Sequence, residues 1–216
     1  MGTVTIAATY GAGGSVVAPR AAQMLGLRMI DRALGRSEAA AAAQPLTDAD
    51  QYLESDELHE SRLTSILSRA MSVSGLWAGM PIPPEDIGYD QRIMETEKAL
   101  RQAADSTGAV ILGRAGVFVL AGRADTLHVR LNGPEEARCR QAMAITNTDH
   151  DQAAKEMKDG DRARRAYIGH FYPGEDWDDP RHYHLVIDST AISLDAVVEI
   201  VVAAARDRFA RIPAKT

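Results

Sequence analysis

The part of the sequence best suited to chemistry is a glycine-rich run, Tyr10-Gly-Ala-Gly-Gly-Ser15, between a short apolar segment and a helical pattern. A glycine-rich turn between a parallel strand and a helix presents backbone N–H groups and the positive helix end to an anion. Glycine lets the chain turn tightly and lets phosphate oxygens approach the backbone. We therefore expect a phosphate cradle made of Gly11, Ala12, Gly13, Gly14 and Ser15.

The run lacks one residue of the common phosphate-binding loop. The pattern G-x-x-x-x-G-K-[ST] carries a lysine, and Gly14 stands in its place, just before Ser15. Ser15 corresponds to the hydroxyl residue that can hold Mg²⁺, although a serine here can also cap the helix. Either other cations replace the lysine, or the chain binds nucleotide without catalysis. In the second case, a gain of activity in Gly14→Lys would show that the missing lysine is the reason.

Five apolar runs are expected to form the strands that position this turn. They are Val4–Ala8, Leu27–Ile30, Ala109–Leu112, Leu127–Leu131 and His184–Ile187. Helical patterns alternate with them, including residues 15–25, which Gly26 ends, and residues 90–104. Such alternation favours a parallel sheet covered by helices, and nearly continuous apolar runs fit strands buried on both faces.

Residues 35–88 interrupt the alternation of strands and helices. This segment combines helical spacing over residues 53–71 with a proline-rich stretch, Met80-Pro-Ile-Pro-Pro-Glu85, that favours a loop. Two interpretations remain open for the insertion. It is either a helical cap on the substrate side or a helical hairpin that only packs on the sheet.

Arginines supply the positive charge that the turn lacks. Without a loop lysine, charge that develops on a transferred phosphoryl group must be stabilised by other cations. Arg162, Arg164 and Arg165 follow Asp161 in a helical segment, and Arg162 and Arg165 share one helix face. We expect these arginines to act on phosphate, with Asp161 orienting one of them. The alternative is a solvated basic face.

Arg114 follows the third apolar run and a glycine, so it emerges at the carboxyl end of a strand. Open α/β sheets bind their ligands at that rim. The alternative role for Arg114 is an ion pair with a neighbouring acid.

Several further pieces accompany the turn and occur in a fixed order from residue 3 to about residue 205. They are Thr9-Tyr-Gly-Ala-Gly-Gly-Ser15, Asp31-Arg32, Leu112-Gly-Arg114, Leu127-His-Val-Arg130 with Pro134 and Glu136-Ala-Arg138, Asp161-Arg-Ala-Arg164 with Tyr167, and Trp177-Asp-Asp-Pro180 with Tyr183-His-Leu-Val-Ile-Asp188. The ordered set resembles the cytidylate kinase-like family, relatives of bacterial CMP kinases among the P-loop nucleoside monophosphate kinases. Members of that family typically share the lysine-free turn. Three residues depart from its pattern: Ser15 is often arginine there, His184 often Asp, and Asp188 often Asn.

The resemblance implies a single P-loop kinase-like α/β domain over residues 1–216: a five-stranded parallel sheet with helices on both faces, a helical insertion at about 35–88 and an arginine lid at about 149–176. It implies Mg²⁺-dependent phosphoryl transfer from ATP to a nucleoside monophosphate, with CMP or dCMP the first acceptor to test. A nucleotide-binding regulatory module and a kinase for another small acceptor remain the alternatives.

The resemblance also implies roles for individual residues. Arg114 would grip the acceptor phosphate, and Asp31 or Arg32 would help to define the acceptor pocket. Arg138 would reach the acceptor phosphate or form a surface ion pair. Asp188 would contact the donor nucleotide or cap the last helix.

The bulk composition limits the classes of function. The net charge of −6 disfavours a surface that coats nucleic acid, and the single cysteine, Cys139, excludes an intrachain disulfide. No apolar stretch approaches the roughly 20 residues of a membrane span, and no secretory signal is visible. We expect a cytoplasmic protein whose partners are small nucleotides. A dinucleotide fold is a weak alternative, because Val16 stands where a third glycine or another small residue is wanted.

Overall fold

The computed structural model describes residues 2–31 and 87–212, with the side chains of residues 87–92 left out. Five parallel strands form one sheet in the order β2-β3-β1-β4-β5. The strands are β1 (Thr3–Ala8), β2 (Arg28–Ile30), β3 (Ala109–Leu112), β4 (Thr126–Asn132) and β5 (Leu185–Asp188). The helices are α1 (Gly14–Leu25), α4 (Ile87–Asp105), α5 (Gly116–Val119), α6 (Glu135–Thr146), α7 (His150–Phe171), the short 3-10 helix η3 (Pro180–His182) and α8 (Leu194–Ala210).

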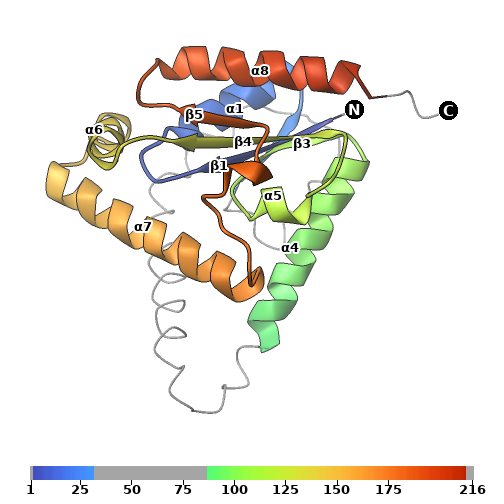
Figure 1. The fold of residues 1–216 in the computed structure, drawn as a ribbon, viewed down its shortest axis with the longest axis horizontal. Coiled ribbons are helices and arrows are strands. Elements are labelled where there is room, and N and C mark those ends of the chain that lie inside the picture. The colour runs from blue at the N-terminus through green and yellow to red at the C-terminus, as the bar shows by residue number, and fades with distance from the viewer. Residues whose placement is uncertain (1, 32–86, 213–216) are drawn as a thin grey trace.

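Helices cover both faces of the sheet (Figure 1). α1 and α8 lie on one face and bury the main core, in which alternate residues of β1 and β4 meet the apolar sides of both helices. α4 and α5 pack on the opposite face with Leu100 and Ile111. A third cluster on that face joins Ala7 and Ala115 to Ile168, Trp177 and Tyr183. This cluster ties α7 and the segment after it to the sheet.

The carboxyl ends of the parallel strands meet at one edge of the sheet. β1 continues from Ala8 into the glycine-rich turn, and β3 continues from Leu112 into Gly113. Ala8 is in register with Leu131 of β4, and Asn132 with Asp188 of β5. The turn, the β3–α5 connection and the end of β5 are therefore neighbours, as ligand sites on open α/β sheets require.

The architecture confirms the predicted sheet and most element bounds. All five predicted strands form, and α1 ends at Gly26, whose φ of +64° is the left-handed conformation that glycine adopts without strain. β5 departs from the expectation of two buried faces, because it is an edge strand and Val186 is 53% exposed. The predicted insertion at 35–88, apart from its last two residues, lies outside the described residues, as does Arg32.

Candidate functional site

The glycine-rich turn is held by side chains that hydrogen-bond three successive carbonyl groups. Arg138 Nη1 donates to the carbonyl oxygen of Tyr10 at 2.8 Å. Gln141 Nε2 donates to the carbonyl of Gly11 at 2.9 Å. Ser189 Oγ donates to the carbonyl of Ala12 at 2.8 Å. Side chains of α6 and of the residue after β5 therefore hold the carbonyl groups of the turn in fixed directions.

The backbone N–H groups that follow these carbonyls lack acceptors. Within residues 2–31 and 87–212, no group accepts a hydrogen bond from the amides of Gly13, Gly14 or Ser15. Gly13 is the N-cap of α1 and supplies no side-chain cap. Three free donors at a helix start fit an anion such as a polyphosphate, because the helix dipole adds to their positive field.

Glycine is required at two positions of the turn. Gly11 and Gly13 have φ of +77° and +74°, a region that L side chains rarely adopt. A Cβ on Gly11 would stand 2.2 Å from the carbonyl oxygen of Arg138, and one on Gly13 would stand 2.5 Å from Leu194. The turn therefore needs glycine both for its conformation and for its close approach to α6 and α8.

Gly14 is required for a different reason, which bears on the Gly14→Lys substitution. A Cβ on Gly14 would stand 2.6 Å from the Cβ of Ala8 and 3.1 Å from Leu112 Cδ1. A side chain at this position would run into the sheet and not over the turn. Gly14→Lys is therefore expected to disturb the packing of α1 and not to restore the charge of a phosphate-loop lysine.

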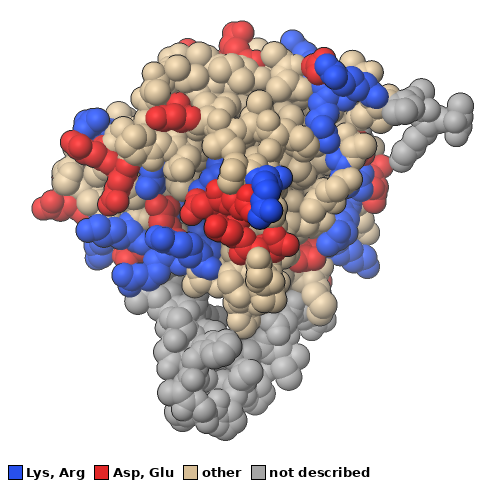
Figure 2. All heavy atoms as spheres, in the orientation of Figure 1, with Lys and Arg blue, Asp and Glu red and all other residues tan. Residues whose placement is uncertain are grey.

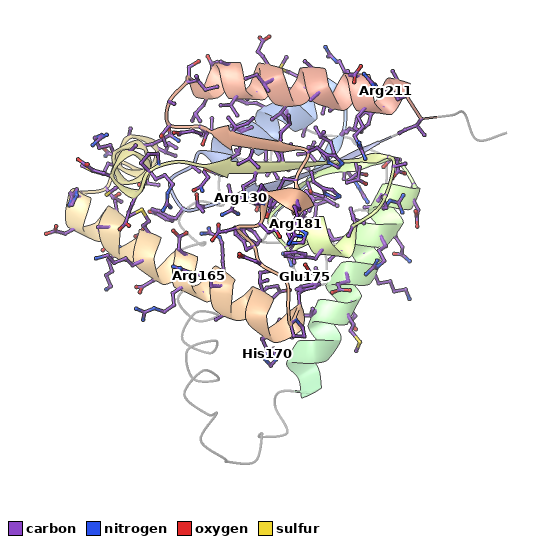
Figure 3. The ribbon with its side chains drawn as sticks, in the orientation of Figure 1. Arg130, Arg165, His170, Glu175, Arg181 and Arg211 are labelled. Atoms are coloured by element: carbon purple, nitrogen blue, oxygen red, sulfur yellow. The ribbon has the colours of Figure 1, made fainter. Side chains whose placement is uncertain are left out.

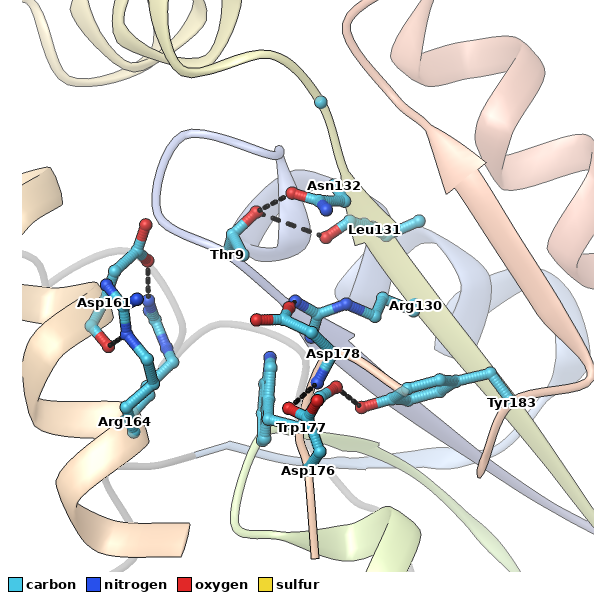
Figure 4. A network of polar contacts seen from close by, with 12 residues as sticks. Thr9, Arg130, Leu131, Asn132, Asp161, Arg164, Asp176, Trp177, Asp178 and Tyr183 are labelled. Atoms are coloured by element: carbon cyan, nitrogen blue, oxygen red, sulfur yellow. Dashed lines mark hydrogen bonds and ion pairs between the residues drawn. The ribbon is translucent and has the colours of Figure 1, made fainter. Parts of the chain in front are cut away.

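Asp161 connects the turn to two arginines. Its Oδ1 accepts from the backbone N–H of Tyr10 at 3.3 Å and from Arg164 Nη1 at 2.9 Å, and its Oδ2 accepts from Arg138 Nη1 at 3.0 Å. The side chains of Arg138 and Asp161 are 9% and 17% exposed, so solvent screens their ion pair weakly. Figure 4 shows Asp161 and Arg164 on α7 facing the end of β1. The expected role of Asp161, to orient an arginine, agrees with this geometry.

The structure separates the arginines of α7. Arg164 is 20% exposed and lies on the face of α7 that meets the turn. Arg162 and Arg165 are exposed, as are Lys155 and Lys158 of the same helix, and Figure 2 shows basic side chains gathered over α7. Among the predicted phosphate-stabilising arginines, only Arg164 lies beside the turn in this conformation.

Arg114 occupies a turn with unusual backbone geometry. Gly113, Arg114 and Ala115 have φ of +73°, +54° and +51°, so two non-glycine residues adopt the left-handed region in succession. Such conformations cost about 1–2 kcal/mol per residue and cluster at functional sites. Arg114 Nε donates to the carbonyl oxygen of Asp31 at 3.0 Å, which brings together two residues predicted to contact the acceptor.

Ser15 and Asp188 do not take their predicted structural alternatives. Gly13, not Ser15, is the N-cap of α1, and the exposed Ser15 hydroxyl has no hydrogen bond within the described ranges. Asp188 does not cap α8, because Ser193 does so by accepting from the N–H of Ala196. Asp188 Oδ1 instead accepts two hydrogen bonds from Thr190, which lower the pKa of the carboxyl. Both side chains stay exposed to solvent near the turn.

Three residues of the site region were given no role of their own from the sequence, although Arg130 stands in one of the pieces that carry the family resemblance. Gln141 and Ser189 hold the turn, and neither residue type signals such a role in a helix or after a strand. The third, Arg130, is 2% exposed and lies between the sheet and α7 (Figure 3). Its signal was present, since a charged residue within the buried run Leu127-His-Val-Arg-Leu131 is rare without a specific partner.

No helix in the described part of the chain is long and apolar enough to cross a membrane.

Within the same residues, no cluster of three or more His, Cys, Asp or Glu side chains is arranged to hold a metal ion. Ser15 is the one residue predicted to bind Mg²⁺, and its exposed hydroxyl, which has no hydrogen bond in the described ranges, would be available to do so. Cys139 is buried in a small apolar cluster with Ala142 of α6 and with Ala153 and Met157 of α7.

The five-stranded parallel sheet and the glycine-rich turn between β1 and α1 define a P-loop kinase-type α/β protein. A sequence model of the cytidylate kinase-like family matches residues 3–191, and the chain belongs to that family. A gluconokinase from Sinorhizobium meliloti shares the fold at a TM-score of 0.52 and 15% identity, with 95% of this chain and 92% of that one covered.

Two further proteins are similar to the chain. An uncharacterized protein from Eubacterium ventriosum has a TM-score of 0.62 at 16% identity and covers 95% of this chain and 99% of its own. A uronate isomerase from Corynebacterium glutamicum is 32% identical over 102 residues, which is 46% of this chain but 19% of that protein. The chain therefore spans about a fifth of the length of this curated relative.

Proposed function

We propose that this protein transfers the terminal phosphoryl group of Mg·ATP to a nucleoside monophosphate, with CMP or dCMP the first acceptor to test. The observation that carries the proposal is which polar backbone groups of the turn have hydrogen-bond partners and which do not. Three carbonyls are tied by Arg138, Gln141 and Ser189, while the amides of the next three residues have no acceptor. Family membership supports phosphoryl transfer with a nucleotide.

The donor nucleotide would bind with its phosphates on the amides of Gly13, Gly14 and Ser15. These amides and the start of α1 would hold the β-phosphate, with Asp188 at the end of β5 close to the nucleoside. Mg²⁺, held through the Ser15 hydroxyl, would neutralise charge between the phosphates. Because the turn is fixed before binding, little reorganisation opposes this electrostatic stabilisation.

Arg164 is the side chain best placed to replace the missing loop lysine. It lies on the inner face of α7, and Asp161 holds it within reach of the turn. A guanidinium here would stabilise negative charge that develops on the transferred phosphoryl group. Arg162 and Arg165 remain proposals for the same role in a conformation in which α7 rotates toward the phosphates.

The acceptor would bind at the carboxyl end of β3. Arg114 is presented there by the strained turn and is joined to Asp31 through a hydrogen bond. We assign Arg114 to the acceptor phosphate, with Asp31 and Arg32 at the acceptor pocket. The chain itself supplies position and charge, and no covalent enzyme intermediate is required.

A second candidate function is a nucleotide-binding regulatory module without catalysis. The observation that favours it is Gly14, because neither the sequence nor the packing admits a lysine at that position. Thermal shifts with ADP and ATP, followed by a coupled assay over a panel of nucleoside monophosphates with Mg·ATP, separate the two. Turnover with one acceptor supports the kinase, binding without any turnover supports the module, and neither binding nor turnover rejects both.

A further inference from the structure

Arg130 and Trp177 form a buried group of hydrogen-bond donors beneath the end of β1. Arg130 is in register with Ala7, one residue before the last residue of β1. Trp177 belongs to the same apolar cluster as Ala7 and as Ala115, the neighbour of Arg114. The group thus lies on the face of the sheet opposite α1 and close to the proposed acceptor rim.

The Arg130 guanidinium is held from three sides. Its Nη2 pairs with the carboxylate of Asp178, and its carbon lies 5.2 Å from the ring centre of Trp177 and 5.7 Å from that of Tyr183. Tyr183 in turn donates its hydroxyl to the carbonyl oxygen of Trp177 at 2.9 Å. Two aromatic faces and one carboxylate fix the orientation of the guanidinium fork.

Two donors of this group have no acceptor. Arg130 Nη1 and Trp177 Nε1 are buried, and neither has a hydrogen-bond partner among the described residues. In Figure 4 the Trp177 ring is seen edge-on, with its nitrogen at the end nearer to Arg130. A buried donor without an acceptor costs about 1–3 kcal/mol and more when charged, so two side by side require an explanation.

We propose that Arg130 and Trp177 form an oxyanion site that takes phosphate oxygens of the acceptor. The site rests on the proposed function and adds two contacts to Arg114. The oxygens of an oxyanion can accept hydrogen bonds from both free donors, and they need no acceptor in return. Asp178, whose side chain is 59% exposed, keeps the other side of the fork oriented and remains hydrated.

Two substitutions test the site without touching the glycine-rich turn. Trp177→Phe keeps an aromatic ring under Arg130 and removes the indole N–H together with part of the ring area, and Arg130→Met removes the guanidinium. Arg181→Met is the matched control, because it removes an exposed guanidinium of the same segment whose ion pair is with Asp179. Each protein is saturated with ADP and titrated by calorimetry with inorganic phosphate, CMP and cytidine.

If the site exists, Trp177→Phe should lower the affinity for both phosphate and CMP about tenfold, and Arg130→Met should lower both affinities further. Affinity for cytidine, which lacks the phosphate, stays unchanged in both, and Arg181→Met matches the original protein throughout. Unchanged phosphate and CMP affinities in Trp177→Phe and Arg130→Met would overturn the site, as would absence of phosphate binding to the ADP-loaded protein. If the unaltered protein did not bind ADP at all, the proposed function would be refuted instead. Titration of the ADP-free protein with phosphate would then still show whether the oxyanion site exists.

Discussion

Arg138 donates to the carbonyl oxygen of Tyr10 while Asp161, its ion-pair partner, accepts from the N–H of the same residue. Both polar groups of the first residue of the turn are therefore fixed by α6 and α7. Arg138 also donates to the carbonyl of Gly133 at 3.0 Å, so its guanidinium is committed to backbone and carboxylate. Its predicted role at the acceptor phosphate remains a proposal, and its observed contacts are those of a clamp on the turn.

Removal of this clamp is expected to weaken nucleotide binding. Arg138→Met removes a buried partner from the Tyr10 carbonyl and from the Asp161 carboxylate, which keeps Arg164, so the cost lies below the roughly 3–5 kcal/mol of a fully broken buried pair. We expect a lower free energy of unfolding and ADP affinity reduced about tenfold, measured by urea denaturation and calorimetry. Arg140→Met on the same helix is the control, because its pair with Glu136 is exposed. Equal ADP affinity in both variants would contradict the clamp.

Gly11→Ala is expected to abolish tight ADP binding. A methyl group there meets the Arg138 carbonyl oxygen at 2.2 Å and also adopts a φ of +77°. Gly26→Ala is the matched control, because Gly26 has a similar φ of +64° but nothing within 4 Å of the added Cβ. The control should lose about 1 kcal/mol of stability and keep its ADP affinity. If both variants bind ADP alike, close packing of the turn is not what shapes the site.

Gly14→Lys is expected to destabilise the fold by about 2 kcal/mol through overpacking and to leave turnover unimproved. The obstacle is the Cβ of Ala8, 2.6 Å from the added atom. A double variant, Gly14→Ala with Ala8→Gly, should therefore recover part of the stability lost by Gly14→Ala alone. Thermal denaturation of the three proteins measures this coupling. A Gly14→Lys protein as stable as the original and more active would show that the lysine position is open.

Arg164 and Arg162 are expected to differ in their effect on turnover. Arg164 faces the turn through Asp161, whereas Arg162 is exposed. Arg164→Met should lower kcat about hundredfold or more if it stabilises the transferred phosphoryl group. Arg162→Met should change kcat little. Coupled assays with the best acceptor decide between them, and a larger loss in Arg162→Met would indicate that α7 rotates during catalysis.

Acid is expected to destabilise the protein through His128. Burial, followed by the positive charges of His184 and Arg208, lowers the pKa of His128 to about 4 from its ordinary 6.5. Because the unfolded chain binds the proton more readily, the stabilisation is present above pH 6.5 and is lost as the pH falls toward 4, up to about 3 kcal/mol. Urea denaturation across this range measures the loss. His128→Asn should flatten the profile, and an unchanged slope would assign the acid sensitivity to other groups.

The sequence predicted the sheet because its strands carry strong local signals. The runs at Ala109–Leu112 and Leu127–Leu131 are apolar almost throughout, and Gly26 ends the first helix where expected. The turn was recognisable from its glycines alone. In these elements local propensity and tertiary packing agree, so the pattern of residue types was sufficient.

The clamps on the turn could not be predicted, because they depend on how separate elements meet. Gln141 reaches Gly11 across 130 positions and Ser189 reaches Ala12 across 177. The direction of a Cβ at Gly14, into Ala8 and not toward solvent, is likewise a property of packing. For the same reason the spacing of Arg162, Arg164 and Arg165 could not show which of them faces the turn.

The central claim is that a turn without lysine binds polyphosphate through its backbone amides. Amide proton–nitrogen correlation spectra recorded during titration with Mg·ADP test it most directly. If the amides bind the phosphates, the amide protons of Gly13, Gly14 and Ser15 should show saturable downfield shifts, larger than those elsewhere in the chain, because each gains an anionic acceptor. Unperturbed amide signals of these three residues at saturating Mg·ADP would show that the turn does not bind polyphosphate through its backbone.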